Sequence, residues 1–116
     1  INTQRKPLDD VRIRKALRLL QEGAGDSLDV DGVAREVGLS RPHFYKLFRE
    51  QVGVTPKLYL NALLMERAIE RLSDGQQPVA DIGFDLGFSG QASFSRFFFA
   101  NGVVAPSAYR RSVQVG

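Results

Sequence analysis

The chain has 116 residues, of which 43% are apolar and 25% are charged, a composition typical of a folded globular protein rather than a disordered one. It contains no cysteine, which excludes disulfides, thiolate nucleophiles and cysteine-based zinc sites. Lysine and arginine outnumber aspartate and glutamate by 16 to 13, an excess that is compatible with nucleic acid but weak evidence by itself. No apolar run approaches the roughly 18 residues that span a bilayer, so we expect an intracellular protein without a membrane partner.

The chain is predicted to begin with a polar, basic linker or tail over residues 1–7. A first helix is then predicted from Asp9 or Asp10, as N-cap, to Glu22, because apolar residues recur along it at helical spacing. A glycine follows at once and ends this helix.

A second, shorter helix is predicted over residues 30–37, with Asp29 as its cap. Gly38 follows it and can take the left-handed conformation that a tight turn needs. Ser40 then caps a third helix, in which Pro42 is tolerated because it stands in the first turn.

The longest predicted helix runs over residues 56–73, with Thr55 as its cap. Units of fewer than about 70 residues rarely bury enough core to fold alone. We therefore expect the two halves of the chain to share this helix.

Three elements are predicted after the long helix. Pro78 opens a fifth helix over residues 79–86, and Ser89 caps a sixth that extends to about Ala100. A short final turn follows Pro106.

The chain contains an internal repeat, in which residues 30–56 reappear as residues 79–106. Matching positions lie 49 apart at first and 50 apart from Phe44 and Phe94 onward, so the second copy has one inserted residue. Each copy reads as a short helix, a glycine turn and a second helix. This is the layout of a helix-turn-helix, which places its second helix in the DNA major groove.

Charge is divided between the two helices of each copy. Residues 26–38 sum to −3 and residues 39–51 to +2, while residues 75–88 carry two acids and residues 89–111 carry three arginines. Positive charge therefore collects on each second helix and at the C-terminus, where DNA phosphates would be met.

Each second helix has two phenylalanines four residues apart, Phe44 with Phe48 and Phe94 with Phe98, which are predicted to face the core. The opposite side is then free for base edges and backbone, which arginine, lysine, glutamine and small residues suit. The candidate DNA-binding residues on these free sides are Arg41, Pro42, Tyr45, Lys46, Arg49, Gly90, Gln91, Ala92, Ser95 and Arg96. A solvated helix face is the better explanation of any one arginine by itself, but the repeat favours DNA binding for the set.

Other classes of function have less support. A helical protein-interaction module would use the repeat only as architecture. An enzyme is disfavoured because His43 is the only histidine and no cysteine is present, so we expect no catalytic site, no cofactor and no metal. An RNA binder is disfavoured because the A-form major groove is too narrow for a helix.

The residues that carry a family resemblance lie mostly in the second copy. They are Ile82, Gly83, Gly87, Phe88, Ser89, Phe94, Ser95, Arg96, Phe98, Pro106, Ser107, Ala108, Tyr109 and Arg110. With them the chain resembles, over about residues 11–111, the DNA-binding domain of the AraC/XylS family of bacterial transcription regulators.

The resemblance implies an all-α fold of about seven helices, with two helix-turn-helix subdomains joined by a long connecting helix. The implied subdomains are residues 8–55 and 74–112, the connecting helix is 56–73, and 113–116 are a tail.

The resemblance also implies the partners. These are double-stranded promoter DNA, read in successive major grooves, RNA polymerase as a further candidate, and an N-terminal effector or dimerisation domain outside this chain. It implies regulation of transcription in the bacterial cytoplasm, for which activation is usual in the family, while the sequence does not separate an activator from a repressor.

The connecting helix of about 18 residues would be roughly 27 Å long, compared with the 34 Å between successive major grooves. We therefore expect an asymmetric target of about two half-sites. The shorter protein spacing favours some bending of the DNA.

Several residues depart from the family pattern. Leu64 stands where an arginine is usual, and Gly83 replaces a usual alanine, which should weaken its helix by about 1 kcal/mol. Gly102 and Val103 invert the usual order of an apolar residue and a glycine, so the sixth helix is expected to close differently. Phe99 stands at a commonly basic position, and we expect burial against the C-terminal turn rather than exposure.

Overall fold

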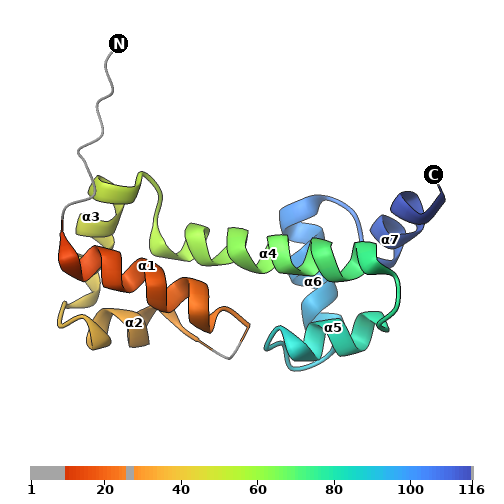
Figure 1. The fold of residues 1–116 in the computed structure, drawn as a ribbon, viewed down its shortest axis with the longest axis horizontal. Helices are drawn as coiled ribbons and strands as arrows, with labels where there is room; N and C mark the ends of the chain where they lie inside the picture. The colour runs from red at the N-terminus through yellow and green to blue at the C-terminus, as the bar shows by residue number, and fades with distance from the viewer. Residues whose placement is uncertain (1–9, 26–27, 116) are drawn as a thin grey trace, which may run out of the picture. The chain divides into compact units, whose positions relative to one another are not determined.

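The computed structural model describes residues 10–25 and 28–115 (Figure 1). These residues form seven α-helices and no strand, which confirms the all-α prediction. The helices are α1 (Val11–Gly23), α2 (Val30–Glu36), α3 (Arg41–Val52), α4 (Pro56–Asp74), α5 (Val79–Asp85), α6 (Gln91–Gly102) and α7 (Pro106–Val115). None of them combines the length and apolar character that crossing a membrane requires. The predicted tail over residues 1–7 lies outside the described residues.

The predicted N-caps of the first four helices are present. Asp10, rather than Asp9, accepts a hydrogen bond from a backbone N–H of α1 at 2.8 Å, and Ser40 Oγ accepts one from α3 at 3.3 Å. The Asp29 carboxylate caps α2 in the same way, and Thr55 Oγ1 caps α4 at 3.2 Å. These local contacts set where each helix begins.

The first compact unit contains α1, α2, α3 and the first turns of α4 up to Leu60. Phe44 and Phe48 of α3 are fully buried in it, with ring centroids 5.6 Å apart. Gln51 is its buried polar residue, and its Oε1 accepts a hydrogen bond from the backbone N–H of Asp10 at 3.1 Å. The start of α1 is therefore fastened to the end of α3.

The second compact unit contains the rest of α4 with α5, α6 and α7. Its core is a cluster of buried residues from α4, α5, α6 and the turn after α5. They are Ala68, Leu72, Ile82, Leu86, Phe94 and Phe98. The 19 residues of α4 thus contribute to both units, as expected for a shared helix.

The prediction of a short final turn after Pro106 is wrong, because α7 is a helix of 10 residues. Tyr109 of this helix packs on Phe98 with ring centroids 5.9 Å apart. Arg110 Nε and Nη2 donate to the backbone carbonyls of Leu72 and Arg71 at 3.1 and 3.4 Å. The helix is held in place because it satisfies carbonyl groups at the end of α4.

The prediction that Ser89 caps α6 is also wrong, since the N-cap is Gly90. The second copy has one more residue than the first between this serine and the first buried phenylalanine, so Ser89 stands one residue too far from the helix to cap it. Ser93 acts instead: its Oγ accepts from the Gly90 N–H at 3.3 Å and donates to the Gly90 carbonyl at 3.0 Å.

The two copies close their second helices differently, as expected from the inverted Gly102 and Val103. In the first copy Gly53 takes the left-handed conformation with φ 101°, whereas in the second Val103 takes it with φ 72°. The sixth helix also continues to Gly102, beyond the predicted end near Ala100. A β-branched residue in this conformation is strained.

Candidate nucleic-acid interface

The third helix has the two faces that the sequence predicts. Phe44 and Phe48 are fully buried on one side. Of the candidates on the opposite side, four are exposed and one is half-buried. The exposed ones are Arg41, Pro42, Lys46 and Arg49, and the half-buried one is Tyr45. Their placement on a free surface is confirmed, while their contact with DNA stays a prediction.

The sixth helix repeats this arrangement in the second unit. Phe94 and Phe98 are buried, with ring centroids 6.0 Å apart. Among the candidates, Gln91, Ala92 and Arg96 are exposed, and Gly90 and Ser95 are half-buried. Both units therefore share the same register, with an aromatic pair buried on one side of the helix and the candidate residues on the open side.

Gly83 of α5 packs closely against the buried side of α6. A Cβ atom at this position would lie 2.7 Å from Phe94 Cβ, far inside normal contact. Ala34, the matching small residue in the first unit, is buried but keeps its methyl group. Gly83 therefore lowers the helical propensity of α5 and in return lets α6 approach.

The cations of α3 form two surface ion pairs. Arg41 Nη1 lies 3.3 Å from Asp31 Oδ1, and Lys46 Nζ lies 3.8 Å from Glu50 Oε2. Such exposed pairs contribute only about 0–1 kcal/mol, so both cations remain available to a DNA ligand. Arg49 forms no ion pair within the part of the chain that the structure describes.

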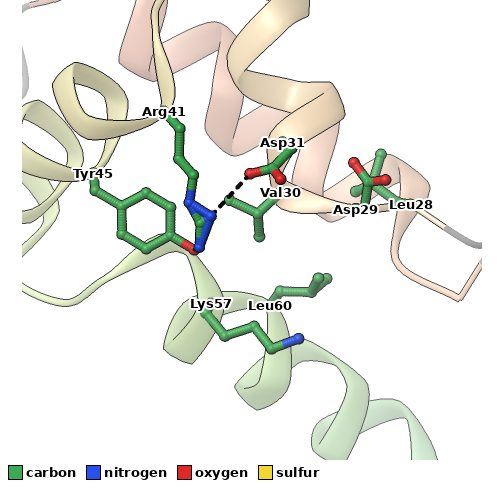
Figure 2. A pocket seen from close by; sticks show the side chains of 8 residues that line it. All are labelled: Leu28, Asp29, Val30, Asp31, Arg41, Tyr45, Lys57 and Leu60. Carbon is green, nitrogen blue, oxygen red and sulfur yellow. Dashed lines mark hydrogen bonds and ion pairs between the residues drawn. The ribbon is translucent and has the colours of Figure 1, made fainter.

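Two hollows flank this face of the first unit. One of about 520 Å³ is lined by Tyr45, Lys46 and Arg49, together with Glu50 and Thr55. The other, of about 350 Å³, lies among the residues shown in Figure 2, which include Arg41 and Lys57. Sequence reasoning missed Lys57, an exposed residue in the first turn of α4. Its signal was its position in the first turn of α4, two residues after the cap Thr55, where it lies near the starts of α2 and α3.

The second unit carries less free positive charge than the sequence suggests. Arg110 is half-buried and occupied with the carbonyls of α4, so this part of the expected C-terminal charge has a structural role. Arg71 is paired with Asp85 at 3.4 Å. The exposed Arg96 is the one cation of α6, whereas α3 has three.

The expected burial of Phe99 is wrong, because 56% of this residue is exposed. Its neighbour Phe97 is half-buried and packs on Phe88 with ring centroids 5.1 Å apart. Phe99 follows the core residue Phe98 by one position, about 100° around the helix, and so turns away from the core. Phe84 of α5 is likewise 71% exposed.

The chain is similar to transcription regulators of known name. A family model described as a helix-turn-helix domain matches residues 33–112. The chain is 32% identical over 111 residues to the arabinose operon regulatory protein of Escherichia coli strain K12, covering 95% of this chain and 38% of that protein. It is 34% identical over 104 residues to the regulatory protein PocR of Salmonella typhimurium, covering 90% and 34%. The chain thus spans about a third of the length of the curated relatives it matches.

Solved structures share the fold. The C-terminal domain of AraT, a response regulator from Geobacillus stearothermophilus, has a TM-score of 0.82 at 25% identity, covering 89% of this chain and 86% of that one. The DNA-binding domain of AdpA, solved in complex with a target DNA, has a TM-score of 0.81 at 21% identity, covering 90% and 94%. With the helix-turn-helix match and these relatives, the chain belongs to the AraC/XylS-type helix-turn-helix family of transcription regulators.

Proposed function

We propose that this chain binds specific double-stranded promoter DNA and activates bacterial transcription, with α3 and α6 as recognition helices in successive major grooves. The observation that carries the proposal is the shared register of the two helices. In each, an aromatic pair is buried at i, i+4 and the opposite face is open and carries polar side chains, joined on α6 by the exposed Phe99. A helix held by one face with the other free is what insertion into a groove requires.

The residues of the two open faces suit different tasks. Arg41, Lys46 and Arg49 on α3 provide charge for phosphates and guanine edges. On α6, Gln91 can pair with adenine, and Ala92 is small enough to contact a thymine methyl. We propose these residues, with Pro42, Tyr45, Gly90, Ser95 and Arg96, as the DNA-binding set.

Names of related proteins support the regulatory role. The relatives include operon regulatory proteins and the transcriptional activator RhaS of Escherichia coli. The DNA-binding domain of AdpA, which shares the fold, was solved on a target DNA. By analogy we propose action in the bacterial cytoplasm, with RNA polymerase as a partner of the activating complex.

We further propose that effector binding or dimerisation resides in a domain outside this chain. The support is the length of the relatives, of which the chain spans about a third. The xylose-binding transcription activator xylR also matches this chain over 28% of its own length, with a TM-score of 0.72 at 27% identity.

Selection of bound sites from random duplex DNA, followed by footprinting of the selected duplex, tests the proposal. We expect one enriched asymmetric site and protection over about two helical turns, roughly 20 base pairs, because two grooves are read. Absence of any enriched site would overturn sequence-specific binding. Protection confined to about five base pairs would overturn the use of both helices.

A further inference from the structure

The guanidinium group of Arg41 is held from two sides within the first unit. Its Nη1 donates to Asp31 Oδ1 at 3.3 Å, and its Nη2 donates to the Tyr45 hydroxyl at 3.4 Å. Its Cζ atom also lies 4.7 Å from the centroid of the Tyr45 ring. Figure 2 shows Arg41 and Tyr45 together on α3, with the dashed line reaching Asp31 of α2. Asp31 and Tyr45 therefore restrict the orientation of a guanidinium group that would otherwise rotate on a long, flexible side chain.

The held group is still available to a ligand. The side chains of Arg41 and Asp31 are 57% and 53% exposed. An arginine has five N–H donors, and these two contacts use two of them. The other three can donate to a ligand. A planar fork of donors in fixed orientation is what bidentate pairing with a guanine edge requires.

Charge distinguishes a base edge from a phosphate as the target of Arg41. The Asp31 carboxylate lies beside the guanidinium, and it would repel a phosphate that bound there. A guanine edge has no net charge, so the carboxylate repels it less than it repels a phosphate. Arg41 is moreover the first residue of α3, and the first residues of a recognition helix reach base edges.

We propose, on the basis of the proposed function, that Asp31 and Tyr45 are positioning residues that orient Arg41 toward a guanine edge. Asp31 touches no DNA in this role and acts through Arg41. The device belongs to the first copy alone within the repeat, because Ala80 stands where the second copy would need the acid. The first recognition helix thus has a specificity determinant contributed by the helix before it.

The matched pair of variants Asp31→Asn and Glu36→Gln tests the proposal. Both remove one exposed negative charge from α2, but Glu36 forms no ion pair within the described residues. Dissociation constants would be measured for the selected duplex, for a duplex with its guanines replaced singly, and for random duplex. Removal of either charge should strengthen binding to random DNA slightly and equally.

For Asp31→Asn we expect the ratio of specific to random affinity to fall about threefold to fivefold, the range that an exposed ion pair supports. The loss should be confined to one guanine position. Glu36→Gln should leave the ratio unchanged, and Tyr45→Phe should lower it in the same direction as Asp31→Asn. In an Arg41→Ala background, Asp31→Asn should have no further effect on the ratio.

Three results would overturn the inference. Equal ratios for Asp31→Asn and Glu36→Gln would mean that Asp31 acts only through its charge. A rise in the ratio for Asp31→Asn would mean that Asp31 sequesters Arg41 instead of orienting it. Equal losses on selected and random DNA for Arg41→Ala would make Arg41 a phosphate contact. If the unmodified chain prefers no selected duplex over random DNA, the proposed function itself fails, which is a distinct outcome.

Discussion

Gly83 of α5 and Phe94 of α6 approach so closely that a Cβ atom at the glycine would lie 2.7 Å from Phe94 Cβ and 2.9 Å from its Cγ. The contact is with the Cβ and Cγ atoms of Phe94, and a change of side-chain rotamer cannot move Cβ away because it is bonded to the backbone. We therefore expect Gly83→Ala to destabilise the chain even though alanine favours the helix by about 1 kcal/mol. Overpacking of this kind costs about 1 to 3 kcal/mol.

Urea unfolding of Gly83→Ala and of the control Gly102→Ala checks this. At Gly102 the added Cβ would meet Met65 Cε at 3.1 Å, the mobile end of a flexible side chain. The control should therefore be neutral or slightly stabilising. A stabilised Gly83→Ala variant would show that α5 and α6 can separate at little cost.

Val103 is expected to gain from replacement by glycine. It holds the left-handed conformation at the end of α6 with φ 72°, and 76% of it is exposed, so its side chain contributes little packing. Val103→Gly should raise the free energy of unfolding by about 1 kcal/mol. The reciprocal change Gly53→Val, at φ 101° in the first copy, should lower the free energy of unfolding by a similar or larger amount. Thermal unfolding of both variants checks this, and a Val103→Gly variant with a lower melting temperature than the original chain would contradict it.

Asp10 gives the stability an acid-dependent component. The pKa of Asp10 is lowered to about 2, first by the side-chain hydrogen bonds from Arg12, whose Nε and Nη2 lie 3.2 and 3.0 Å from its oxygens. Because the pKa is depressed in the folded state, this stabilisation is present above the unfolded value near 4 and is lost as the pH falls toward 2.

The variant Asp10→Asn isolates this component, since asparagine still caps a helix but does not ionise. We expect the stability difference between the original chain and the variant to shrink between about pH 4 and pH 2. A difference that stays constant over that range, measured by urea unfolding, would contradict the lowered pKa.

Arg96 is expected to contribute specificity to the second unit. Arg96→Ala should weaken binding to the selected duplex by about 1 to 3 kcal/mol and relax the preference at one base position. Arg96→Lys keeps the charge but loses the planar fork, so it should restore affinity for random DNA and not the lost preference. If both variants lose affinity equally on selected and random duplexes, Arg96 contacts phosphate.

Local signals in the sequence predicted most of the fold. Asp29 and Ser40 cap their helices, and Phe44 and Phe48 are buried, because caps and i, i+4 pairs depend on residues a few positions apart. The length of α7 was not predictable in this way, since it depends on Arg110 reaching a carbonyl 38 residues earlier. A contact between residues so far apart in the chain produces no periodic pattern in the sequence from which it could be predicted.

The candidate site was predictable as a set of positions but not as a set of interactions. The buried pairs indicated which side of each helix is free, and the structure places the candidates there. The pairing of Arg41 with Asp31 depends on how α2 meets α3, which composition and spacing do not specify. The exposure of Phe99, by contrast, follows from its position one residue after the buried Phe98, so helical spacing alone could have predicted it.

The extra residue at the start of α6 also changes how one copy should be compared with the other. From the first residue of each recognition helix onward, equivalent positions differ by 50, so Lys46 corresponds to Arg96 and Arg49 to the exposed Phe99. A scientist who wished to transplant base preference between the copies would have to follow this correspondence and not that of the preceding turn. A shift of one position would rotate each grafted side chain by about 100° around the helix axis, away from the bases it was chosen to meet.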